Sequence, residues 1–249
     1  MYPLYPRLLI GLLAGFISFT IAGTLSHEAG HFVVAKYCGF DASIHYGYTS
    51  FDQMPTAFKQ TDDTIRALHD KYKLVRKRGR HYILSDSIDF PEKRQYEALI
   101  RRQQQTLFLI DLGGPLQTML TGTAGFVLLT SNRRWWAKKK ELAKLVWVIV
   151  FATLFWLRQS FNLAMATYGA LVGGSWPSQM DETKLAIHLH LWPATISLVT
   201  GLTGLSVLAF VTLRVIPAKQ RLTFIVSGLV GGSFGFWFWL IWLGPIVMP

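Results

Sequence analysis

The sequence predicts an all-α polytopic membrane protein, with about five to six transmembrane helices and a small polar insert between the first two spans. Apolar residues make up 51% of the 249-residue chain and charged residues only 16%, against roughly 25% charged in an ordinary soluble domain. Long stretches carry no Asp, Glu, Lys or Arg, and a spanning helix needs about 20 mainly apolar residues. These stretches are 8–26, 112–132, 145–157, 159–180, 185–213 and 222–249.

The first uncharged run is predicted to be a retained transmembrane helix rather than a cleaved signal peptide. It covers 8–26, which is longer than the usual apolar core of roughly 7–15 residues in a signal peptide. It also runs directly into a second helical pattern at 29–36. Residues 1–40 are therefore the first predicted unit, a span that carries the sequence HEAGH near its end.

Charged residues are concentrated in a basic insert at 41–104, which is predicted to be exposed to water. Residues 105–190 are predicted to form the core spans, and 191–249 the C-terminal spans. Within the insert we expect a short strand or turn at 43–50, an amphipathic basic helix at 64–80, a short strand at 81–84 and a helix at 91–105 that leads into the second span.

The net charge of +11 is interpreted as loop charge that faces anionic lipid headgroups. Nucleic-acid binding is not expected, because the chain carries no signature of a nucleic-acid-binding module. The bilayer is therefore an expected partner, whereas no oligomeric state is specified. The positive-inside rule, applied to the short linkers 133–144 and 214–221, places those linkers inside and the insert outside.

The motif His27-Glu28-Ala29-Gly30-His31 is the most informative stretch of the sequence. Positions i and i+4 of an α-helix are about 400° apart, so both imidazoles leave the same face. Two histidines at this spacing are typical of zinc ligands, and a glutamate between them can act as general base and acid. An unpaired carboxylate at membrane depth is also costly, and a bound dication would compensate it.

A catalytic zinc usually has three protein ligands and one open position. Candidates for the third ligand at membrane depth are Asp111, Asp181, Glu182, His188 and His190. Asp181 follows a turn-rich break, which is tolerated in a membrane where it lines a cavity; capping of a helix is an equally good interpretation of this residue. His188 and His190 would diverge by about 200° on a helix, and Asp111 could support a ligand or pack a helix.

These residues resemble the site-2 protease family of intramembrane zinc metalloproteases. The HEAGH motif ends an apolar helix and continues through small and apolar residues to a glycine at position 39. The stretch GGPLQT at 113–118 is similar to the family's Ala/Gly-Gly-Pro helix, which packs against the zinc helix. The stretch PSQMDE at 177–182 resembles the family segment whose Asp is the third zinc ligand.

The resemblance implies one zinc ion held by His27, His31 and Asp181, with Glu28 as general base and acid. It also assigns helix packing or substrate positioning to Gly113, Gly114, Pro115, Asn162 and Glu182. Two departures from the family pattern are Glu182, which replaces the usual Gly, and Thr118, which replaces an Asn. Family members place the zinc toward the cytosol, which opposes the orientation from the linker charges.

The expected function is hydrolysis of peptide bonds in transmembrane protein substrates, within or at the edge of the bilayer. One alternative is a non-proteolytic scaffold or substrate-binding relative that kept the fold. Another is a metal-ion transporter, although a carrier has no need of Glu28 and the chain has no internal repeat. The glycines at 228, 232 and 235 are interpreted as packing within the monomer, with a dimer interface as the alternative.

Overall fold

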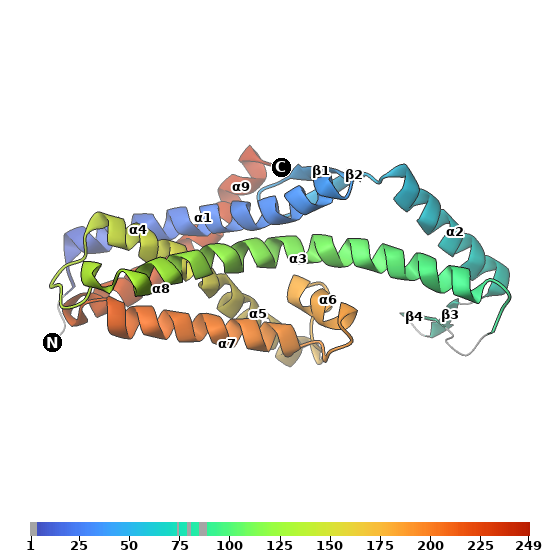
Figure 1. The fold of residues 1–249 in the computed structure, drawn as a ribbon. Helices are drawn as coiled ribbons and strands as arrows, with labels where there is room; N and C mark the ends of the chain where they lie inside the picture. Colours follow the sequence, from blue (N-terminus) through green and yellow to red (C-terminus); the bar gives the residue numbers. More distant parts are fainter. Residues whose placement is uncertain (1–3, 74, 79–80, 85–88) are drawn as a thin grey trace.

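The computed structural model describes residues 4–73, 75–78, 81–84 and 89–249, most of which are helical. The helices form an elongated bundle, and the polar insert extends from one end of it (Figure 1). The α-helices are α1 (Pro6–Tyr37), α2 (Thr56–Tyr72), α3 (Lys93–Ser131), α4 (Lys144–Thr153), α5 (Leu157–Gly173), α6 (Asp181–His188), α7 (Thr195–Phe210), α8 (Arg221–Phe236) and α9 (Gly244–Val247). Shorter 3-10 segments lie at Arg133–Trp135, Leu154–Trp156 and Ala218–Gln220, and π-helical segments at Val211–Val215 and Trp237–Leu243.

Four helical stretches in the described part of the chain are long and apolar enough to cross a membrane: 6–37, 144–173, 195–215 and 218–247. Large apolar side chains are exposed on the outside of these helices, Ile10 and Leu171 among them. This exposure is expected where lipid, rather than water, surrounds a helix. The predicted all-α, multi-span character is confirmed at this level, whereas the count of five to six spans is not.

Helix α3 accounts for the difference in the span count. Its C-terminal half contains most of the uncharged stretch 112–132 and lies beside α1 and α4 (Figure 1). Glycines, threonines and Gln117 lower the hydropathy of this half. Small residues let helix backbones approach closely within a membrane bundle, so the composition of α3 suits contact with other helices.

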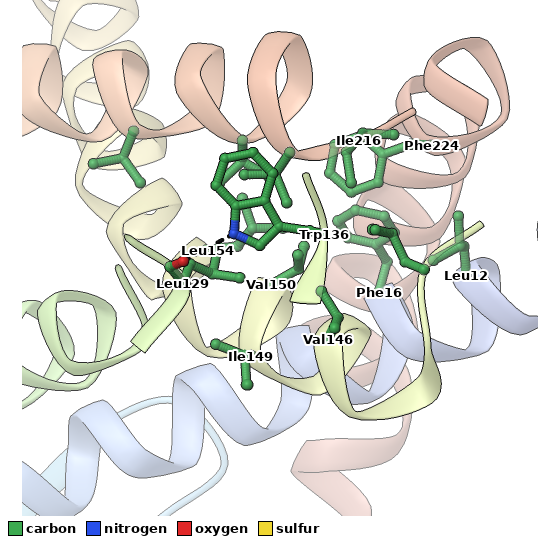
Figure 2. Packing of buried hydrophobic residues seen from close by; sticks show 14 residues of the cluster. Leu12, Phe16, Leu129, Trp136, Val146, Ile149, Val150, Leu154, Ile216 and Phe224 are labelled. Atoms are coloured by element: carbon green, nitrogen blue, oxygen red, sulfur yellow. Dashed lines mark hydrogen bonds between the residues drawn. The ribbon is translucent and has the colours of Figure 1, made fainter. Parts of the chain in front are cut away.

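An apolar cluster at one end of the bundle holds α1, α4, α7 and α8 together. Figure 2 shows Phe16 of α1 against Phe224 of α8, with Val146 and Val150 of α4 beside them. The rings of Phe16 and Phe224 lie 5.5 Å apart between centroids. The indole N–H of Trp136 donates to the backbone carbonyl of Leu129, which satisfies the one polar group of this buried side chain.

Close backbone approaches fix the neighbours of α1. A Cβ on Gly30 would lie 2.4 Å from the carbonyl oxygen of Gly113, so α1 and α3 touch at the HEAGH motif. On the other side, Gly228 and Gly235 of α8 pack against α1, as predicted for packing within the monomer. Gly232 differs, because a Cβ there would meet nothing within 4 Å.

The insert begins with a β-hairpin rather than a single strand or turn. Strands β1 (Asp41–Ile44) and β2 (Thr49–Gln53) are antiparallel. Trp239 donates from its indole N–H to the carbonyl of Tyr46, at 2.7 Å, and this bond ties the hairpin to the C-terminal helices.

The helix predicted at 64–80 is displaced in the structure, where α2 covers Thr56–Tyr72. Thr61, Ile65 and Leu68 form its buried face, and Lys73 ends it in the left-handed conformation with φ 50°. Strand β3 (Val75–Arg78) then pairs antiparallel with β4 (His81–Leu84), which confirms the predicted strand at 81–84. Residues 74, 79 and 80 of the predicted helix lie outside the described residues.

The predicted helix at 91–105 is confirmed as the beginning of α3. This helix runs without interruption from the insert into the bundle, across the expected boundary at residue 104 (Figure 1). Its N-terminal half packs against α2 through Tyr96, which joins the cluster of Ile65, Leu68 and Phe90. One continuous helix therefore joins the insert to the bundle, in addition to the bond between the hairpin and Trp239.

Candidate metal centre

His27 and His31 lie one turn apart in the C-terminal part of α1, and both are buried, with 1% and 8% of their surface exposed. Their Nε2 atoms are 3.3 Å apart. The i, i+4 spacing therefore places both imidazoles on one face, as the sequence predicts.

The second ring nitrogen of each histidine bonds to α3, which fixes its tautomer. Nδ1–H of His31 donates to the carbonyl oxygen of Ile110, at 2.7 Å. Nδ1 of His27 lies 2.9 Å from the hydroxyl of Thr118. Because that hydroxyl donates its own hydrogen to the carbonyl of Gly114, it accepts from His27. Both Nε2 atoms therefore present a lone pair, the form in which imidazole binds a metal.

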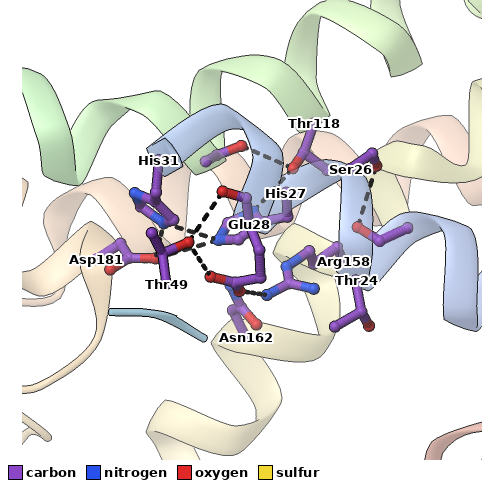
Figure 3. Close-up of polar contacts among 12 residues, drawn as sticks. Thr24, Ser26, His27, Glu28, His31, Thr49, Thr118, Arg158, Asn162 and Asp181 are labelled. Atoms are coloured by element: carbon purple, nitrogen blue, oxygen red, sulfur yellow. Dashed lines mark hydrogen bonds and ion pairs between the residues drawn. The ribbon is translucent and has the colours of Figure 1, made fainter. Parts of the chain in front are cut away.

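Asp181 completes the group from α6, 150 residues away in sequence from His31. Its Oδ2 atom lies 3.2 Å from Nε2 of His27 and 3.2 Å from Nε2 of His31 (Figure 3). Asp181 is the first helical residue and Met180 is the cap, so the structure does not support a capping role for Asp181.

The three ligand atoms fit a metal ion in both geometry and charge. They lie within 4.8 Å of one another, with separations of 3.2, 3.2 and 3.3 Å. Ligands about 2.0–2.1 Å from a tetrahedral zinc are roughly 3.3–3.4 Å apart. Three hydrogen-bond acceptors that converge without a donor between them repel one another, and a cation removes that repulsion. This group can therefore hold a metal ion.

Glu28 lies beside this group, 5% exposed, and its carboxylate is held by two other elements. Its Oε2 atom accepts a hydrogen bond from the hydroxyl of Thr49 in β2, at 3.2 Å. Its Oε1 atom lies 3.9 Å from Nη2 of Arg158 in α5 (Figure 3). Glu28 is thus close to the histidines in sequence but is not one of the three converging ligands.

Helix α3 passes directly over the two imidazoles. A Cβ on Gly114 would lie 2.3 Å from Nε2 of His31 and 2.6 Å from Nε2 of His27. A side chain at this position would occupy the space in front of both lone pairs. Gly113, Gly114 and Pro115 are all buried in the contact between α3 and α1 or α6, where the sequence places helix packing.

Asn162 and Glu182 face each other rather than the three ligands. Nδ2 of Asn162 donates to Oε1 of Glu182, at 2.9 Å, and joins α5 to α6. Glu182 is almost fully buried, and that burial raises the pKa of its carboxyl above the ordinary value, although the bond from Asn162 opposes the change.

Two other candidate ligands, Asp111 and His188, belong to an ion-pair group that reaches Asp181 through Lys184. Lys184 has its Nζ atom 3.5 Å from Asp111 and 3.8 Å from Asp181. Nε2 of His188 lies 3.6 Å from Asp111. Asp111 therefore pairs with α6 and, among the described contacts, makes none with His27 or His31. His190 lies just beyond the end of α6 and is exposed.

Sequence reasoning missed three partners of the site: Thr49, Arg158 and the carbonyl of Ile110. Arg158 carried a signal, because it is a single charge between two long uncharged stretches and a charge at membrane depth needs a partner. Thr49 and Ile110 carried none, since their contacts depend on how the hairpin and α3 pack against α1. Comparison of the chain with family models, curated proteins and solved structures finds no match.

Proposed function

We propose that this protein is a multi-pass intramembrane zinc protease, which hydrolyses peptide bonds of membrane-protein substrates within or at the edge of the bilayer. The observation that carries the proposal is the arrangement around His27 and His31. Their two lone pairs and the Asp181 carboxylate converge on one point, and a separate carboxylate lies on the same turn of α1. A metal centre with an adjacent general base is the arrangement that metal-assisted hydrolysis needs.

Zinc is the metal that this set of ligands fits best. Two neutral imidazole nitrogens and one carboxylate oxygen match the usual three protein ligands of catalytic zinc, which leave one position open. A zinc ion bound there would supply Lewis acidity, which makes water more acidic and polarises a substrate carbonyl.

Glu28 is proposed as the group that moves protons. Its carboxylate takes a proton from the attacking water and then gives it to the nitrogen of the leaving amine. Thr49 positions the carboxylate by its hydrogen bond to Oε2. Arg158, at 3.9 Å from Oε1, supplies the opposite charge that a buried carboxylate requires.

The location of the site in α1 also restricts the substrate. Glu28 is buried at the C-terminal part of a helix that is long and apolar enough to span a membrane. A transmembrane substrate helix hides its peptide bonds in its own hydrogen bonds, so a segment must unwind before it can be cut. Helices interrupted by glycine or polar residues unwind most readily, and we expect them as substrates.

The proposal is tested with the purified protein in lipid vesicles and two labelled transmembrane peptides. One peptide has an uninterrupted Leu-rich span of about 20 residues, and the other carries Gly-Asn-Gly at its centre. We expect cleavage of the interrupted peptide, loss of cleavage after treatment with a zinc chelator, and recovery when zinc is restored. Cleavage that persists after the metal has been removed, or zinc-loaded protein that cuts neither peptide, would contradict the proposal.

A further inference from the structure

The β1–β2 hairpin lies against α1 and brings Thr49, the first residue of β2, to Glu28 (Figure 1). The hydroxyl of Thr49 lies 3.0 Å from the carbonyl oxygen of Glu28 and 3.2 Å from its Oε2. The hydroxyl has one hydrogen, and both acceptors belong to Glu28, so either bond fixes the same residue. An isolated two-stranded hairpin is only marginally stable. The position of Thr49 therefore depends on what holds the turn of the hairpin.

The turn is held by the C-terminal part of the chain at Tyr46. The indole N–H of Trp239 donates to the carbonyl of Tyr46, at 2.7 Å. The backbone N–H of Tyr46 donates to the carbonyl of Met248, at 3.1 Å. A Cβ on Gly244 would lie 2.7 Å from the Cβ of Tyr46, so the two segments are in close contact. Both backbone polar groups of Tyr46 are thus bonded to the C-terminal segment.

Trp239 differs from its aromatic neighbours in where its side chain lies. It is 6% exposed, whereas Trp237 and Trp242 are 48% and 52% exposed. All three belong to the π-helical segment Trp237–Leu243, and π-helical turns are frequent at functional sites. The one polar group of the buried indole is used on the hairpin. Trp239 is therefore the aromatic residue of this segment that holds the turn.

We propose that Trp239 is a positioning residue, which holds the hairpin so that Thr49 keeps Glu28 in place for proton transfer. This inference rests on the proposed function. Trp239 acts through the hairpin, because it bonds to Tyr46, three residues before Thr49. A misplacement of about 1 Å can lower the rate of an enzyme by about 10². Loosening the hairpin should therefore slow cleavage and leave the metal ligands intact.

The first test compares cleavage of the interrupted peptide by variants of the whole chain. Trp239→Phe keeps a ring and removes the N–H. We expect kcat to fall roughly five- to tenfold, as for the loss of one hydrogen bond, with KM and zinc content unchanged. Trp242→Phe, the matched control in the same segment, should cleave at the wild-type rate. Wild-type kcat in Trp239→Phe would overturn the proposal.

A double variant shows whether Trp239 acts through Thr49. Thr49→Val removes the hydroxyl and should lower kcat at least as far as Trp239→Phe does. Residues that act through one contact are not additive, so Trp239→Phe combined with Thr49→Val should be no slower than Thr49→Val alone. If the two losses multiply instead, Trp239 acts by another route and the proposal is overturned.

A cross-link provides a rescue that a general loss of stability would not show. A Cβ on Gly47 would lie 2.8 Å from Cδ2 of Leu240, so Gly47→Cys and Leu240→Cys bring two thiols together between the turn and the π-helical segment. These changes are combined with Trp239→Phe and with Cys38→Ser, which removes the one native cysteine. We expect kcat to recover when the disulfide forms and to fall again on reduction. A complete cross-link without recovery would contradict the proposal.

The last test needs no cleavage. Nitroxide labels are attached through Ile10→Cys and Tyr48→Cys, at two exposed positions, in the Cys38→Ser background. Pulsed electron resonance then gives the distance between α1 and the turn. We expect a narrow distribution in this background and a broader one when Trp239→Phe is added. An unchanged distribution would overturn the proposal. A broader distribution in a protein whose wild type cuts neither peptide would confirm the hold on the hairpin and place the failure in the proposed function.

Discussion

The Glu28→Gln variant is expected to bind metal as the wild type does and to lose peptide-bond cleavage. Glutamine keeps the shape of the side chain and can still accept the hydrogen bond that Thr49 donates. It cannot take a proton from water at neutral pH, so the general-base step fails. Loss of such a group typically lowers rates by about 10² to 10⁴. The measurement is the initial rate on the interrupted peptide, with metal content determined on the same preparation.

A matched control separates this effect from the general loss of a carboxylate. Glu97 of α3 is exposed and pairs only loosely with Arg101, at 3.9 Å. Glu97→Gln should cleave at the wild-type rate. Full turnover by Glu28→Gln would show that another group moves the proton and would remove the proposed mechanism.

Gly114→Ala is expected to abolish metal binding, although it changes no ligand. The added methyl group would lie 2.3 Å from Nε2 of His31 and 2.6 Å from Nε2 of His27, in the space that a bound ion would share. Helix α3 could withdraw from the imidazoles only by giving up the backbone contact between Gly113, one residue earlier, and Gly30 of α1. We therefore expect loss of both metal and cleavage. The measurement is a zinc titration against a chromophoric chelator.

Gly125→Ala is the control for Gly114→Ala on the same helix. Its added methyl group would lie 2.5 Å from the backbone nitrogen of Thr153, at another helix contact. This variant should lower the unfolding temperature, since overpacking costs about 1–3 kcal/mol, and yet retain zinc. If Gly114→Ala binds zinc as tightly as Gly125→Ala does, the Nε2 atoms do not face the metal.

The sequence predicts well the features that are set by helix geometry or by the high free-energy cost of placing a charge at membrane depth. Helix periodicity alone places His27 and His31 on one face. Charge is rare at membrane depth, so Asp181 stands out although it is 150 residues from His31. The same reasoning left Asp111 as a candidate ligand. Only the packing of α6 against α3 shows that Asp181 lies beside the imidazoles and that Asp111 pairs with Lys184 instead.

The features that the sequence does not predict depend on contacts between distant segments. The boundaries of α2 differ from the expected helix because its buried face, from Thr61 to Leu68, is set by packing on α3. The bond from Thr49 to Glu28 depends on where the β1–β2 hairpin folds back on α1. The glycines of α3 lowered its hydropathy, and their role becomes visible only in the structure, where Gly113 meets Gly30 and Gly125 meets Thr153.

The metal content of the purified protein tests the central claim most directly. We expect one zinc ion per chain in the wild type and in Asp111→Ala, a control that removes a neighbouring carboxylate outside the three ligands. His31→Ala and Asp181→Ala should lose the ion, because only two of the three ligands remain. A wild type without zinc, or Asp181→Ala with stoichiometric zinc at unchanged affinity, would contradict the account.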